Sequence, residues 1–186
     1  MKKIVIFASG SGSNAENIYH QLHSTVEIQC IFCNNSKAGV IERAERLNIP
    51  LVIFNRSEWT DSQTIENQIS ELNPDLIVLA GFLWKVPESF VARFPQKIIN
   101  IHPALLPNYG GKGMYGQHVH EAVIAAKEPK SGITIHYVNE HYDEGEYILK
   151  AECELTSTDT PDTLAQKIHE LEFKYFPLTI QKLLTA

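Results

Sequence analysis

Short apolar runs alternate with amphipathic segments along the first hundred residues. Runs rich in branched aliphatic and aromatic side chains predict strands at residues 4–8, 27–33, 51–54, 76–80 and 97–101. The segments between them predict helices at residues 14–23, 40–47, 60–72 and 87–94; in the third, apolar residues recur every three or four positions. This alternation is typical of an α/β fold of the Rossmann-like, doubly wound type, with a mostly parallel sheet.

The pattern changes after Pro107. Residues 108–116 contain four glycines and predict a loop, and a helix is expected over residues 117–126. Residues 132–138 alternate in polarity and predict a strand, which we expect to pair antiparallel with a second strand at 147–154. A helix over residues 161–184, with a kink expected at Pro177, should end the chain. No repeat or linker divides the chain, so we expect a single domain over residues 1–186.

Composition narrows the class of protein. The chain has 186 residues, with 16 basic and 22 acidic side chains and a net charge of −6, which argues against a nucleic-acid partner. No apolar run approaches the length of about 18 residues that a membrane span requires, and no signal-peptide pattern opens the sequence. We therefore expect a soluble, cytoplasmic protein with no membrane association.

Two pairs of residues could suggest a metal or redox site, and their spacing argues against both. Cys30 and Cys33 are three apart on a predicted strand, so they should face opposite sides and serve as core thiols. His118 and His120 are two apart at the start of a predicted helix, where their side chains diverge by about 200°. With Cys153, the three cysteines do not form a disulfide framework.

Asn100 and His102 stand at the carboxyl end of a buried strand that Pro103 terminates. Residues two apart share a strand face, so both side chains should point the same way, at the edge where α/β sheets bind ligands. An amide donor beside an imidazole suits the stabilisation of an oxyanion. The alternative is that Asn100 caps the next turn and His102 is a buried histidine with local partners, and this stretch alone favours that alternative.

The glycine-rich loop after the first strand, residues 9–14, offers backbone N–H groups and a helix N-terminus to an anion such as phosphate. It lacks the lysine of a Walker loop, and Gly10 and Gly12 are only part of a dinucleotide fingerprint. An ordinary tight turn explains the same residues equally well.

Four motifs carry a resemblance that covers the chain from Met1 to the last helix. They are ASGSGSN at residues 8–14, LAGF at 79–82, NIHPALLP at 100–107, and the segment 132–145. With these motifs the sequence resembles the phosphoribosylglycinamide formyltransferase family, the purine branch of the folate-dependent formyltransferases. The pair Asn100 and His102 with the later Asp143 marks the formyltransferase fold, and the Gly-Ser-Asn loop and Pro103 mark the purine branch.

The resemblance implies an enzyme that transfers the formyl group of 10-formyltetrahydrofolate, its co-substrate, to the amine of glycinamide ribonucleotide, without a metal. It implies a nucleotide-binding part at residues 1–100 and a catalytic, folate-binding part at 101–186, in a monomer or homodimer. Asn100 and protonated His102 would stabilise the oxyanion, while Asp143 holds the imidazolium and assists proton transfer. The phosphate would be held by Gly12, Ser13 and Asn14, and the ribose by Glu172. The pterin pocket would be lined by Leu83, Trp84, Lys85, Val86, Val91, Asn139, Glu140 and His141.

The chain departs from the family pattern at two places. Leu83, Trp84 and Lys85 stand where many members have Met-Arg, and the segment 110–116 is longer and richer in glycine than usual. Both flank the expected site, so the resemblance does not define the contacts of the folate tail or the covering loop.

Three other functions share some of these sequence features. A formyltetrahydrofolate deformylase would use the same catalytic residues on water, but usually has an additional N-terminal domain, whereas this sequence starts directly with its first strand. A methionyl-tRNA formyltransferase would need an RNA-binding domain and more positive charge. A catalytically silent nucleotide-binding module is expected only if Asn100, His102 and Asp143 do not converge in space.

Overall fold

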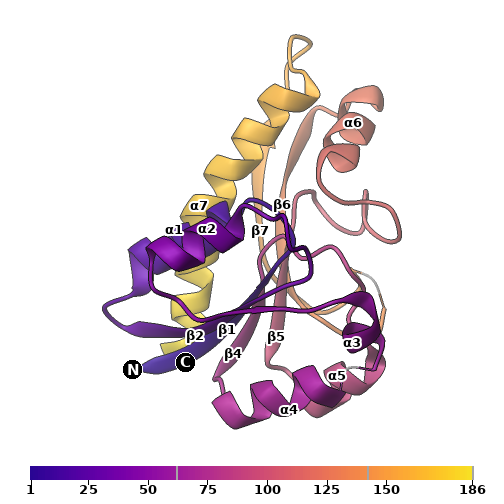
Figure 1. Ribbon diagram of the computed structural model, residues 1–186. Coiled ribbons are helices and arrows are strands. Elements are labelled where there is room, and N and C mark those ends of the chain that lie inside the picture. Colours follow the sequence, from indigo (N-terminus) through magenta and orange to yellow (C-terminus); the bar gives the residue numbers. More distant parts are fainter. Residues whose placement is uncertain (62, 142, 186) are drawn as a thin grey trace.

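The computed structural model describes residues 1–61, 63–141 and 143–185, and within them seven strands form one sheet. The sheet order is β3-β2-β1-β4-β5-β6-β7 (Figure 1). Neighbours from β3 to β5 are parallel, whereas β6 pairs antiparallel with both β5 and β7. The expected doubly wound sheet and the antiparallel C-terminal pair are confirmed. The strands are β1 (Lys2–Ala8), β2 (Val26–Cys33), β3 (Leu51–Ile53), β4 (Leu76–Leu79), β5 (Ile98–His102), β6 (Lys130–Tyr137) and β7 (Tyr147–Glu154).

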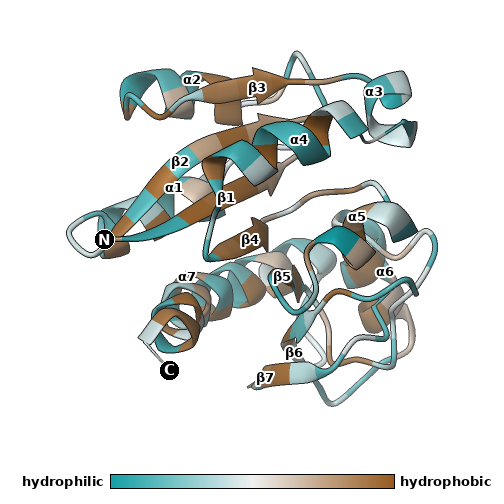
Figure 2. Ribbon diagram, turned by 90° about the horizontal axis from the view of Figure 1, so that it is seen from below, coloured by the Kyte–Doolittle hydropathy of each residue, from teal (hydrophilic) through white to brown (hydrophobic). Residues whose placement is uncertain are grey.

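Helices cover both faces of the sheet, and each face has its own hydrophobic core. On one face pack α1 (Ser13–Leu22), α2 (Val40–Arg46), α6 (Gln117–Ala125) and α7 (Pro161–Thr185). On the other pack α3 (Arg56–Thr60), α4 (Gln63–Leu72) and α5 (Glu88–Arg93). Hydrophobic residues are concentrated in the central strands (Figure 2). Because Cys30 and Cys33 belong to different cores, their predicted opposite orientation is confirmed, and burial raises the pKa of Cys30 to about 11.

The structure corrects the helix predicted over residues 60–72. A separate short helix, α3, begins earlier because Asn55 and Glu58 form a capping box, with hydrogen bonds of 2.7 and 3.0 Å. It ends at Thr60, and α4 starts at Gln63, so the predicted start at residue 60 is wrong. The final helix α7 continues through Pro177.

The strand order reverses at β1, which lies between β2 and β4. At such a switch point the connecting loops leave in opposite directions and open a crevice at the strands' carboxyl ends. Two hydrogen bonds tie the loops together here: the Ser9 N–H donates to the Gly81 carbonyl at 3.0 Å, and the Leu83 N–H to Ser9 Oγ at 2.9 Å. None of the described helices is both long and apolar enough to cross a membrane.

Candidate active site

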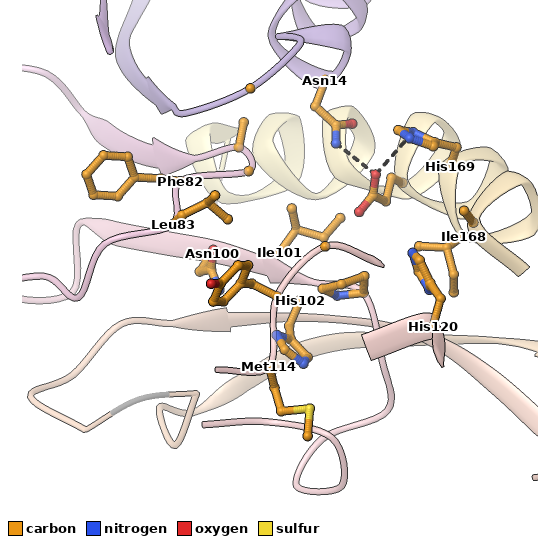
Figure 3. Close-up of a pocket in the computed structure, with 18 of the residues that line it drawn as sticks. Asn14, Phe82, Leu83, Asn100, Ile101, His102, Met114, His120, Ile168 and His169 are labelled. Atoms are coloured by element: carbon orange, nitrogen blue, oxygen red, sulfur yellow. Dashed lines mark hydrogen bonds and ion pairs between the residues drawn. The ribbon is translucent and has the colours of Figure 1, made fainter. Parts of the chain in front are cut away.

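A cavity of about 560 Å³ opens at the carboxyl ends of β1, β4 and β5, between the loops that follow them and α7 (Figure 3). It brings together predicted site residues from segments far apart in the sequence. The glycine loop lies at one side and Glu172 on the α7 wall. The catalytic candidates among its lining residues are Asn100, His102 and Asp143. The three residues therefore converge in space, which argues against a catalytically silent nucleotide-binding module.

The loop after β1 delivers the N-terminus of α1 to this cavity. Gly12 occupies the N-cap position with φ of +77°, a left-handed conformation that favours glycine. It provides no side-chain cap, and the Ser13 N–H has only a long contact of 3.4 Å to Ser11 Oγ. The first turn of α1 thus presents N–H groups to the cavity, as an anion site requires.

Glu172 is a buried carboxyl on the α7 wall of the cavity, with 8% of its surface exposed. Asn14 Nδ2 donates to Glu172 Oε2 at 2.9 Å, and His169 Nδ1 lies 3.5 Å from the same oxygen (Figure 3). Burial raises the pKa of Glu172, although Asn14 and His169 act against that rise. The predicted phosphate and ribose residues are therefore directly linked through Asn14.

His102, one of the catalytic candidates, lies next to the carboxylate of Asp143. Its Oδ2 lies 3.6 Å from His102 Nδ1 and accepts the Gly111 N–H at 2.9 Å. His102 Nε2 donates to the Tyr109 carbonyl at 2.7 Å, since a carbonyl oxygen can only accept. The neutral ring therefore carries its proton on Nε2 and presents a lone pair on Nδ1 toward Asp143.

His136 is a site residue that the sequence analysis missed. It lies on β6 directly opposite Asn100 on β5, and Asn100 Nδ2 is 3.1 Å from His136 Nε2. His136 Nδ1 donates to the Tyr137 carbonyl at 2.9 Å, so Nε2 is the acceptor for the amide of Asn100. His136 Nε2 also lies 3.6 Å from Asp143 Oδ1. The only sequence signal for it was that His136 shares a strand face with Thr134, in a strand that is otherwise largely apolar.

Burial sets the protonation of this group. Desolvation lowers the pKa of His102, and the opposing influence of Asp143 and of the Tyr109 carbonyl does not overcome it. The resting ring therefore favours the neutral form at pH 7. Burial alone would raise the pKa of Asp143, but the facing His136 and His102 and the Gly111 N–H hold it below its usual range. Asp143 is ionised and ready to stabilise an added proton.

Of the residues expected at the pterin pocket, Leu83 lines the cavity and the others do not. Leu83 lines the cavity beside Phe82, with 45% of its surface exposed. Trp84 turns toward a separate hollow, where the Arg56 guanidinium lies 4.7 Å from its ring centroid. Four others are outside the cavity lining: the buried Val86, the half-buried Val91 and Asn139, and the exposed Lys85. Glu140 and His141 are also exposed and outside it. Their contacts with folate stay a prediction.

The glycine-rich segment covers the other side of the cavity. Residues 111–116 all line it, and the hydrogen bond from Gly111 to Asp143 fixes one end of the segment to the catalytic group. Tyr109 holds the preceding turn: its hydroxyl donates to Glu128 at 2.7 Å, which, with burial, raises the pKa of Tyr109 to about 12.

Comparison with known proteins identifies the family. The family model described as formyl transferase matches residues 2–180. The chain is 37% identical over 191 residues to phosphoribosylglycinamide formyltransferase of Bacillus subtilis, covering 99% of this chain and 95% of that protein. It is 34% identical to the chloroplastic protein of the same name from Arabidopsis thaliana, covering 94% of this chain. It spans 63% of the length of that plant relative.

A solved structure gives the same result for the fold. The crystal structure of phosphoribosylglycinamide formyltransferase from Bacillus halodurans is 33% identical and superposes with a TM-score of 0.90, covering 100% of this chain and 96% of that one. The match of nearly the whole chain to the family model, in sequence and in fold, shows that this protein belongs to the formyl transferase family.

Proposed function

We propose that this protein transfers the formyl group of 10-formyltetrahydrofolate to the amine of glycinamide ribonucleotide, a step of purine biosynthesis. The observation that carries the proposal is the joining, in one cavity, of an open helix N-terminus suited to phosphate and the group of Asn100, His102 and Asp143. The names of the relatives agree with it. A cavity of about 560 Å³ is in the usual range for small-molecule sites.

The nucleotide would lie along the α1 and α7 walls. Backbone N–H groups at Gly12, Ser13 and Asn14 hold its phosphate, because the positive end of the α1 dipole favours an anion. Glu172 accepts hydrogen bonds from ribose hydroxyls. The glycyl amine then reaches the catalytic group at the carboxyl end of β5. In this arrangement, residues 1–100 hold the phosphate and supply Asn100, and residues 101–186 supply His102, Asp143 and the ribose contact.

The reaction forms a bond between the amine nitrogen and the formyl carbon. An oxyanion develops on the formyl oxygen, and the amide of Asn100 donates to it, with His136 holding that amide in place. The amine loses one proton and N10 of the folate gains one when its bond to carbon breaks. His102 Nδ1 takes up the proton from the amine and returns it to N10, and Asp143 stabilises the imidazolium between these two transfers. Because Nε2 is occupied by Tyr109, proton transfer is the role we assign to His102.

The folate would enter beside Leu83, the expected pterin residue that lines the cavity. Positioning a nucleophile next to the formyl carbon converts a bimolecular reaction into one within a complex, a large source of rate. The other expected folate contacts, at residues 84–86, 91 and 139–141, lie outside the cavity lining, so they would form only with parts of the folate beyond this entrance.

The experiment separates the transferase from a deformylase. The protein is incubated with 10-formyltetrahydrofolate, with and without glycinamide ribonucleotide, and formate and formylated nucleotide are quantified. We expect slow loss of the formyl group without the nucleotide and rapid, stoichiometric formylation with it. Rapid release of free formate in the absence of nucleotide would contradict the proposed function.

A further inference from the structure

His120 is a buried polar residue of the cavity that the mechanism above does not use. It lies on α6, is 7% exposed, and its ring lies beside Ile168 of α7 (Figure 3). Its Nδ1 is closed off from solvent and has no hydrogen-bond partner in the described part of the chain. A buried ring nitrogen without a hydrogen bond costs stability, typically about 1–3 kcal/mol, so keeping a histidine at this position points to a role for its other nitrogen, Nε2.

The surroundings of His120 keep the ring neutral. Burial lowers its pKa, and His169 and His102 on either side lower it further. A neutral imidazole is a hydrogen-bonding group and a poor counter-ion for phosphate. Among backbone groups, buried N–H groups without an acceptor are rarer than unpaired carbonyl oxygens, and by the same reasoning we assign Nδ1 as the unprotonated nitrogen. The proton then resides on Nε2, the ring nitrogen that the cavity can reach.

We propose that His120 Nε2–H donates to a ribose hydroxyl of glycinamide ribonucleotide, and that His120 and Glu172 together recognise the sugar's cis-diol. This inference rests on the proposed function, in which the phosphate binds at α1 and the amine reaches His102. His120, Ile168 and Glu172 line the wall between these two ends, where the sugar must pass. A donor from α6 and an acceptor from α7 match the mixed hydrogen-bonding capacity of neighbouring hydroxyls.

The test compares glycinamide ribonucleotide with its 2′-deoxy and 3′-deoxy analogues in four variants and the wild type. His120→Phe and His120→Leu are apolar replacements of different size, and His120→Gln keeps an N–H donor on a side chain of similar reach. His118→Phe is the matched control, since His118 lies on the same helix with its side chain 64% exposed and paired with Glu121. The measured quantity is kcat/KM for each nucleotide at saturating folate.

We expect the wild type to prefer the ribonucleotide over at least one deoxy analogue. His120→Phe or His120→Leu should lower kcat/KM for the ribonucleotide by about 2- to 10-fold, the usual effect of one hydrogen bond, and leave that analogue unaffected. His120→Gln should restore part of the preference, and His118→Phe should retain all of it. KM for the folate should not change in any variant.

Several results would overturn the inference. They are a wild type that turns over ribo- and deoxynucleotides equally, an apolar variant that lowers kcat/KM equally for both, and an unchanged preference after substitution. A wild type without activity on any of the nucleotides would instead contradict the proposed function, so the two failures are distinguishable.

Discussion

Substitution of Asp143 by asparagine tests the electrostatic core of the site. The carboxylate lies 3.6 Å from His102 Nδ1. At that distance, with an effective dielectric constant of about 20, it stabilises an imidazolium by about 4–5 kcal/mol. Removing the charge should therefore lower kcat by roughly a thousandfold, since about 1.4 kcal/mol corresponds to a factor of ten. The asparagine oxygen still accepts the Gly111 N–H, so the loop should stay in place.

The assay is the initial rate of nucleotide formylation with both substrates saturating. Glu144→Gln is the matched control, because it removes a charge from an exposed neighbour and should keep nearly full activity. His102→Ala combined with Asp143→Asn should cost much less than the product of the single losses, because the two residues act as a unit. An Asp143→Asn enzyme within about tenfold of the wild type, or single losses that multiply, would refute the reasoning.

The pH profile provides a second readout for the same variant. His102 must be unprotonated to accept the proton, so kcat/KM should fall as pH falls through its pKa, which burial sets below the usual 6.5. Asp143 raises that pKa, so its neutralisation should move the acid limb of Asp143→Asn to lower pH, beneath a lower plateau. A limb that stays in place would show that another group controls it.

Substitutions in the glycine loop, at His136 and at His120 test neighbouring features. A Cβ at Gly10 meets no atom within 4 Å, so Gly10→Val should keep the wild-type Tm but raise KM for the nucleotide about 10- to 100-fold by obstructing the phosphate. In Gly12→Val, by contrast, the Cβ would lie 2.5 Å from Val40 Cγ2, so calorimetry should show a lower Tm. His136→Phe should lower kcat about 5- to 100-fold with little change in KM, because the amide of Asn100 loses its acceptor, and His136→Gln should recover part of the rate. The pKa of His120 is lower in the folded than in the unfolded state, so below about pH 6.5 the unfolded state binds more protons and the stability of the wild type falls with acidification. His120→Phe lacks this effect, so its Tm relative to wild type should rise as pH is lowered from 7 to 5.

Much of the fold could be predicted from local patterns. Continuous apolar runs marked the parallel strands, and the two-residue period placed Asn100 and His102 on one face, where both line the cavity. The separate helix α3 was not predicted, because its start is set by the side-chain hydrogen bonds of Asn55 and Glu58, and such a capping box is a weak signal in the sequence. Periodicity therefore identified the elements better than their ends.

The site was harder to predict, because it depends on distant pairings. Nothing in the spacing of residues brings Asp143 within 3.6 Å of His102, and only the family resemblance joined them. His136 was not predicted as a site residue, because its contact with Asn100 depends on the antiparallel pairing of β6 with β5, which the sequence did not indicate. His120 was considered only as a metal ligand, and its depth in the cavity depends on how α6 packs against α7.

The cross-strand pairing of Asn100 with His136 also constrains how the chain can change in length. A slip of β6 by one residue against β5 would turn its side chains to the opposite faces and replace His136 by Ile135 or Tyr137. Insertions in the connections before and after β6 should therefore be tolerated only when they are absorbed outside the ladder. A design that grafts new loops onto this scaffold must therefore preserve this register and, in the connection after β6, the position of Asp143 beside His102.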